Sequence, residues 1–185
     1  MKPKTLLTGF VLATIGLSPL VRAQEHEHHH ATMEKAGSFA IPASLREEHE
    51  ELHAQLGQLT KLPGKTGEAA RAVADALHPH FVKEEEYALP ALGLLPALGR
   101  GEVTPEMRNV LPGTDRLKAE LPQMLAEHKA IGAALDRLAE AAKAEGRKEA
   151  ADFARELRHP ARTEEEILYP AAIVVGEYVR LKLEK

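Results

Sequence analysis

One pattern limits what this chain can fold into more than any other. A histidine, a run of three glutamates about one helical turn later and a closing proline occur twice, from His80 to Pro90 and from His159 to Pro170. A histidine and a glutamate four residues apart lie on one face of an α-helix, where both can bind the same metal ion. A single pair of this kind is common on helix surfaces, so the recurrence gives the pattern its weight.

A second pair of matching segments precedes the two copies. Glu48-His49 and Glu127-His128 each stand at the head of an amphipathic stretch. The distance from this histidine to the histidine of the following motif is 31 residues in both halves. Each half therefore has the pattern of helix, turn and helix, and the sequence predicts two copies of one helical hairpin.

The expected fold class is all-α, an up-down-up-down four-helix bundle built from the two hairpins. The chain is rich in Ala, Leu, Glu, Lys and Arg and has no Trp, a composition typical of helical bundles. The four helices are expected to begin at Ser44 and end before Pro63, to span Thr66–Leu89, to span Asp115–Ala144, and to run from Gly146 to Pro170, with residues 171–183 as a continuation.

Local signals refine these bounds. Ser44 and Glu47 form a capping box at the start of the first helix. Pro79 is expected to kink the second helix just before His80, and Pro112-Gly113 to interrupt the segment before the third helix.

The equal spacing predicts that four histidines meet. Each lies about 15 residues from the middle of its own turn, roughly 23 Å along the helix, so all four converge on one level of the bundle. The four residues are His49, His80, His128 and His159. Buried imidazole and carboxylate groups are costly unless they are paired or bind a metal. Because the chain has no Cys, thiolate ligands are excluded, and this ligand set suits iron, with zinc, manganese and copper as rivals.

The first 41 residues are expected to lie outside the bundle. Residues 1–23 have a basic start, a short interrupted apolar run and small residues before Gln24, as in a cleaved secretory signal peptide rather than a membrane anchor. Residues 24–41 read as a His-rich flexible arm, either a plain linker or a loose metal binder, and 42–185 as the bundle. The mature chain is then expected to be periplasmic or secreted and not membrane-anchored.

Charge limits the partners. Removal of residues 1–23, which hold three basic and no acidic residues, changes the formal net charge from −4 to −7. This surplus of acidic groups argues against nucleic acid as a partner. No protein partner is indicated.

Taken together, these motifs resemble the hemerythrin-like (HHE cation-binding) family, over roughly Ser44 to Val179, here as an exported bacterial member. The resemblance implies a non-haem di-iron centre, two iron ions bridged by carboxylates, and members of the family bind oxygen reversibly, sense oxygen or iron, or handle nitric oxide and peroxide. The metal ligands that it implies are His49, His80, Glu84, His128, His159 and Glu164, with His53 as a further candidate.

Two of these positions depart from the family pattern. His159 is five residues before Glu164, with Pro160 in between, so a local widening of the helix at Pro160 would be needed to bring the two side chains together. His53 lies one turn after His49 and is either a ligand or a surface residue. His78 is expected to be incidental.

Oxygen or a similar small diatomic is the expected ligand of this centre, because the surrounding face is apolar and no nucleophile or general base is poised for turnover. Two alternatives remain. Glu50-x-x-His53 and Glu156-x-x-His159 match the unit of ferritin-like di-iron oxidases. A periplasmic zinc or copper protein fed by the His-rich arm is the other.

Overall fold

The computed structural model describes residues 39–184, and every regular element in this range is helical. The predicted signal peptide and nearly all of the His-rich arm lie outside the described residues. In chain order the elements are α1 (Ala43–Leu59), α2 (Gly64–Lys83), η1 (Glu84–Ala88), η2 (Pro90–Leu94), α3 (Leu95–Gly99), η3 (Pro105–Val110), α4 (Leu111–Ala144), α5 (Lys148–Glu156), α6 (Arg158–Thr163), η4 (Glu164–Leu168) and α7 (Tyr169–Leu183). The predicted all-helical class is confirmed.

The first hairpin has the predicted order of helix, turn and helix, but its start differs from the prediction. α1 begins at Ala43, directly after Pro42, and no side chain caps it. The capping box predicted at Ser44 is therefore wrong, because Ser44 already lies inside the first turn. The turn into α2 depends on Gly64, whose φ of 78° lies in the left-handed region that favours glycine.

Both hairpins contain a π-helical turn at the same place in the repeat. η1 begins at Glu84 and η4 begins at Glu164, so each starts at the first glutamate of its triple-glutamate run. In a π-turn the N–H bonds five residues back, and the Leu89 N–H indeed donates to the Glu84 carbonyl at 2.9 Å. The widening predicted for the second repeat is present, but it follows Glu164 rather than preceding it.

The third long helix is longer than predicted. α4 begins at Leu111 and includes Pro112 and Gly113, so these residues do not interrupt the segment. Pro112 lies in the first turn, where its missing N–H has no helical partner to lose. Gly113 allows a close approach, since an added Cβ would lie 3.1 Å from the Tyr87 carbonyl oxygen.

The last helical segment is interrupted at one residue. α5 ends at Glu156, Leu157 forms a turn, and α6, η4 and α7 follow without a loop. The predicted continuation of the tail is α7, and its Gly176 packs so closely on α4 that a Cβ would lie 2.3 Å from the Thr114 hydroxyl oxygen.

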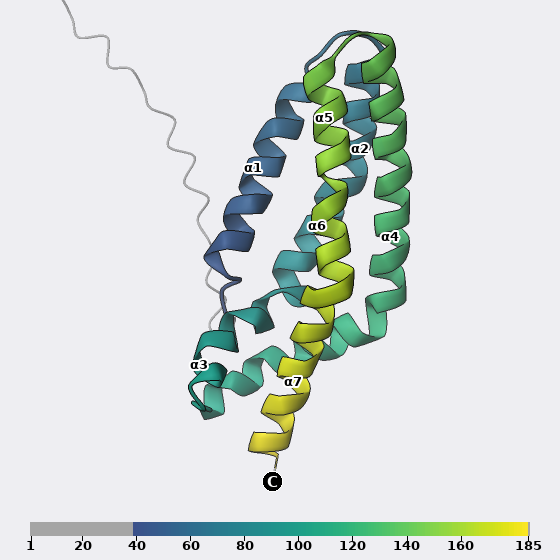
Figure 1. Cartoon of the computed structure of the whole chain (residues 1–185). Coiled ribbons are helices and arrows are strands. Elements are labelled where there is room, and N and C mark those ends of the chain that lie inside the picture. Colours follow the sequence, from purple (N-terminus) through teal and green to yellow (C-terminus); the bar gives the residue numbers. More distant parts are fainter. Residues whose placement is uncertain (1–38, 185) are drawn as a thin grey trace, which may run out of the picture. The chain divides into compact units, whose positions relative to one another are not determined.

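α4 lies against α2 and also against α5 and α7, while α1 packs on α2 (Figure 1). Two apolar clusters form the interior. One is built around η1, η2, η3 and α7, and the other around α2, α4 and α5. Along α4, Met124 belongs to the first cluster and Ile131 to the second, with buried His128 between them. The bundle therefore contains a polar layer between two apolar ones.

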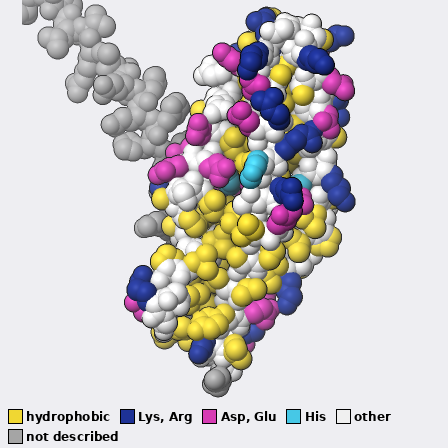
Figure 2. Space-filling view, viewed as in Figure 1, with side chains coloured by type: hydrophobic (Ala, Val, Ile, Leu, Met, Phe, Trp, Pro, Cys, Tyr) yellow, Lys and Arg dark blue, Asp and Glu magenta, His cyan; other side chains and the backbone are white. Residues whose placement is uncertain are grey.

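Apolar and charged side chains are also distributed unevenly over the surface (Figure 2). In the face drawn in Figure 2, hydrophobic side chains gather over the half that holds α3 and α7, and histidine side chains are visible near the middle. None of the described helices is both long enough and apolar enough to span a bilayer.

Candidate metal centre

Four side chains meet in the polar layer of the bundle. One ligand atom from each of them lies within 4.8 Å of the others, and all four residues are buried. They are His80 from α2, Glu84 from η1, His128 from α4 and Glu164 from η4. The closest approach is between the Nε2 atoms of His80 and His128, at 2.8 Å.

His49 joins this cluster from α1. Its Nε2 lies 3.5 Å from Oε2 of Glu84, and the residue is only 3% exposed. The ring stacks on Phe81 with the centroids 4.1 Å apart and the planes at 3°. This stacking fixes the ring so that Nε2 points at the carboxylate. The polar layer thus holds three imidazoles and two carboxylates.

Each imidazole is held from behind by a second carboxylate. Because an ionised carboxylate can only accept a hydrogen bond, the Nδ1 atom of each ring must carry the proton. The pairs are His49 Nδ1 with Glu85 Oε1 at 3.0 Å, His80 Nδ1 with Glu127 Oε2 at 2.9 Å, and His128 Nδ1 with Glu165 Oε1 at 2.8 Å. Carboxylates in this position orient metal-ligating histidines and raise their basicity.

The inner atoms have the properties expected of ligands for a cation. With Nδ1 protonated, each neutral ring directs the lone pair of Nε2 inward, so His80 and His128 face each other with two lone pairs. Oε2 of Glu84 is buried and accepts no hydrogen bond. A buried carboxylate oxygen without a partner is costly. A positive ion placed among these atoms would satisfy all of them, and the residues therefore fit a metal.

The charges of the cluster shift the pKa values of its members. Burial lowers the pKa of His80, but the neighbouring carboxylate of Glu84 and the hydrogen bond to Glu127 outweigh burial and raise the pKa above 6.5. The pKa of His128 is raised in the same way, by Glu164 and Glu165 acting against burial. The region therefore attracts positive charge, which a proton or a metal ion can supply.

The pKa values of Glu164 and Glu127 are shifted in opposite directions. Burial raises the pKa of Glu164, and the nearby charge of Glu84 adds to the effect. Burial also favours a higher pKa for Glu127, but hydrogen bonds from His80, Lys83 and Gln123 lower its pKa to about 2. The outer carboxylate is thus firmly ionised and holds the Nδ1 proton of His80 in place.

A tyrosine also reaches the cluster. The hydroxyl of Tyr169 donates to Oε1 of Glu84 at 2.5 Å and lies 3.3 Å from Nε2 of both His80 and His128. Its side chain is completely buried. Burial and the charges of Glu84 and Glu164 raise its pKa well above the usual range.

Two predicted ligands lie outside the cluster. His53 and His159 are both exposed, and neither is among the buried polar residues. The expected convergence of four imidazoles on one level is wrong for His159, because the turn between it and Glu164 is α-helical and the π-turn begins only at Glu164. Residues five apart in an α-helix point about 140° from each other, so His159 turns away. His78 is exposed as well, as expected.

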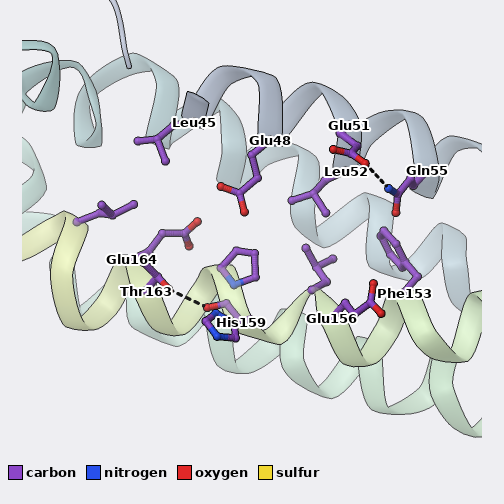
Figure 3. A pocket seen from close by; sticks show the side chains of 13 residues that line it. Leu45, Glu48, Glu51, Leu52, Gln55, Phe153, Glu156, His159, Thr163 and Glu164 are labelled. Atoms are coloured by element: carbon purple, nitrogen blue, oxygen red, sulfur yellow. Dashed lines mark hydrogen bonds between the residues drawn. The ribbon is translucent and has the colours of Figure 1, made fainter. Parts of the chain in front are cut away.

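An open cleft lies beside the cluster, between α1 and the helices α5 and α6. It has a volume of about 390 Å³, and its walls combine apolar side chains with glutamates. In Figure 3, Glu48 and Glu164 point toward each other across it, while the ring of His159 lies away from α1. Glu164 belongs to both the cleft and the cluster, so the cleft borders the candidate metal centre at this residue.

Glu85, Glu127, Glu165 and Tyr169 were not among the residues predicted to form the site. A sequence pattern for the three glutamates was present, because an acidic residue adjoins a ligand position at equivalent places in both repeats. The pattern does not indicate which imidazole each carboxylate contacts, because every such pair joins different helices.

Comparison with known protein families places most of the described residues in one family. A family model described as "Hemerythrin HHE cation binding domain" matches residues 40–172, which include every residue of the cluster. No curated protein and no solved structure matches the chain significantly.

Proposed function

The chain belongs to the family of hemerythrin HHE cation-binding domains, and from that premise we propose that it holds a pair of iron ions and reversibly binds oxygen or a similar small diatomic. The protein would then act as a carrier, scavenger or sensor. Metal binding agrees with the buried cluster of histidines and glutamates.

The observation that carries the proposal is the position of Glu84. Its two oxygens face different imidazoles, since Oε2 lies 3.5 Å from Nε2 of His49 and Oε1 lies 3.6 Å from Nε2 of His80. Glu84 would therefore help to hold the pair of ions together with both of these imidazoles. Glu164, whose Oε2 is 3.1 Å from Nε2 of His128, supplies the second carboxylate.

The choice of iron follows from the ligand chemistry. Imidazole and carboxylate without thiolate suit iron, and zinc, manganese and copper are the rivals within this ligand class. When bound, the iron would supply the atom to which a small ligand binds. The buried histidines and glutamates would hold the ions, and the outer carboxylates would keep the imidazoles oriented.

The cleft disfavours an anionic ligand. Beside Glu164 its walls include Leu45, Leu52 and Leu168, while Glu48 and Glu51 give it negative charge. Anions are repelled by these carboxylates, whereas a neutral diatomic is not.

The ferritin-like oxidase has less support. Its two Glu-x-x-His units would place His53 and His159 at the metals, and both side chains are exposed and outside the cluster. The alternative of a zinc or copper protein is tested by identifying the metal that the chain retains.

Two further parts of the proposal concern architecture and location. We propose that the four long helical segments follow the up-down-up-down order of a four-helix bundle. We also propose that residues 1–23 direct export and that the mature chain is periplasmic or secreted.

Metal analysis of protein purified from an iron-replete culture tests the metal centre. The expected result is iron as the main metal, with a pair of ions per chain. The reduced protein is then exposed to air, and the oxygen is removed. Return of the reduced spectrum without added electrons supports reversible binding, whereas lasting oxidation contradicts it. Retention of zinc or copper alone would contradict the assignment of iron.

A further inference from the structure

The second repeat lacks a ligand that the first repeat has. His80 stands four residues before Glu84, but the residue four before Glu164 is Pro160. The repeats differ at a second place, because Leu89 follows Glu84 by five residues and Tyr169 follows Glu164 by five. The second repeat therefore loses an imidazole at one position and gains a phenol at another.

The π-turn explains why this phenol reaches the centre. Because the N–H of Tyr169 bonds to the carbonyl of Glu164, Tyr169 lies one wide turn after Glu164 on the same face of the helix. In a regular α-helix a residue five positions later would point about 140° away. The ring of Tyr169 also stacks on His128, with centroids 5.8 Å apart and planes at 18°, which fixes the direction of its hydroxyl.

The hydroxyl oxygen occupies a position among ligand atoms. It lies 3.3 Å from Nε2 of His80, 3.3 Å from Nε2 of His128 and 2.5 Å from Oε1 of Glu84. A hydroxyl that served only to pack the core or to satisfy one carboxylate would have no need to face both inward nitrogen lone pairs.

We infer that the phenol oxygen of Tyr169 is a further metal ligand, in place of the imidazole that Pro160 removes from the second repeat. This inference rests on the proposed metal centre. As the bond between oxygen and metal forms, the phenol releases its proton to solvent, and no electron is transferred. Phenolate is an anionic oxygen ligand of the hard type that ferric iron prefers, and it gives an absorption band in the visible region by charge transfer to ferric iron.

Tyr87 provides a matched control. Tyr87 lies in η1, the π-turn of the first repeat, and is also buried. Its hydroxyl, however, donates to Glu120 at 2.8 Å and approaches the sulfur of Met124 at 3.3 Å. Replacing it by Phe removes a buried hydroxyl of the same kind without touching the cluster.

The test compares visible spectra of the ferric protein, of Tyr169→Phe and of Tyr87→Phe at equal iron content. Because other transitions to iron absorb in the same region, the difference between the proteins is decisive. The expected result is complete loss of one band in Tyr169→Phe, with iron retained, and an unchanged spectrum in Tyr87→Phe. An unchanged spectrum in Tyr169→Phe would mean that the phenol only donates a hydrogen bond to Glu84, and would overturn the inference.

A second measurement needs no variant. Resonance Raman spectra of the ferric wild-type protein should show enhanced ring vibrations of a bound tyrosinate, and their absence would also overturn the inference. With zinc supplied instead of iron, ionisation of Tyr169 should appear as an ultraviolet difference band. Metal uptake without any tyrosinate signal contradicts only the role of Tyr169, whereas a chain that takes up neither metal contradicts the proposed metal centre as well.

Discussion

The Nε2 atoms of His80 and His128 lie 2.8 Å apart in the interior of the bundle, although 48 residues separate them in the chain. Each ring is held by a carboxylate at its other nitrogen, so both present a lone pair to the same point. Two lone pairs at this distance need a positive charge between or beside them. This relationship makes the metal dependence of stability testable.

Replacing His128 by Leu should abolish the stabilisation of the protein by metal. Metal that binds only the folded state stabilises it by about 4 kcal/mol when its free concentration is 1,000 times the Kd. The wild-type Tm should therefore rise on addition of iron, and the Tm of His128→Leu should not. Thermal unfolding with and without metal measures this, and His78→Ala, at an exposed position on α2, is the control. A metal-dependent Tm in His128→Leu would contradict the assigned centre.

Replacing Glu127 by Gln should weaken metal binding without removing a ligand. Its carboxylate orients His80 and also contacts Lys83 and Gln123. Loss of such an outer carboxylate typically lowers metal affinity by about 10- to 100-fold. Competition with a chelator measures the change. Glu120→Gln, which alters the partner of Tyr87 and leaves the cluster intact, should show wild-type affinity.

Replacing His159 or His53 by Ala should leave the metal content unchanged, because both side chains are exposed and lie outside the cluster. His49→Ala should lower it, since His49 faces the otherwise unpartnered oxygen of Glu84. Metal stoichiometry of the three purified variants distinguishes these cases. Loss of metal from His159→Ala would contradict the exclusion of His159 from the centre.

The carboxylate of Glu145 should make stability depend on pH. It joins the end of α4 to the start of α2 by accepting hydrogen bonds from the N–H groups of Lys65 and Thr66, at 2.8 and 3.1 Å, and from the Thr66 hydroxyl, at 2.6 Å. The hydroxyl and the two N–H groups lower the pKa of Glu145 below 4.5. A lowered folded-state pKa stabilises the protein above the unfolded-state pKa, and this contribution is lost as pH falls through the folded-state value.

Glu145→Gln should therefore have a lower Tm than wild type at neutral pH, with a difference that shrinks as pH falls below 4.5. Thermal unfolding across this pH range measures the difference. Glu140→Gln, at an exposed position of α4, is the control and should follow the wild-type curve. A constant difference between Glu145→Gln and wild type would contradict the role of its charge.

Replacing Leu138 by Ala should separate folding from metal binding. Leu138 is completely buried in the apolar cluster of α2, α4 and α5. Truncation of a buried Leu typically costs about 2–5 kcal/mol of unfolding free energy. Denaturant unfolding of the metal-free protein measures the loss, and the metal stoichiometry of the folded variant should be unchanged. A cost below about 1 kcal/mol would mean that the site collapses around the smaller side chain.

The sequence by itself determined the helical class and identified most members of the buried cluster of histidines and glutamates. Apolar periodicity and the paired motifs depend on local geometry, so the positions of His80 and Glu84 on one helical face could be read directly. The equal spacing of the two halves then brought His49 and His128 to the same level, because helical rise is constant along each hairpin.

Only the tertiary structure decided which side chains complete the centre. The direction of a side chain at the end of a helix depends on whether the turn is α or π, and the same triple-glutamate run allows both. The π-turn begins at Glu164 rather than at Pro160, so it turns Tyr169 toward the cluster and leaves His159 in solvent. Likewise, the pairing of Glu127 with His80 joins two helices, and packing between helices is a property of the whole bundle rather than of any local segment.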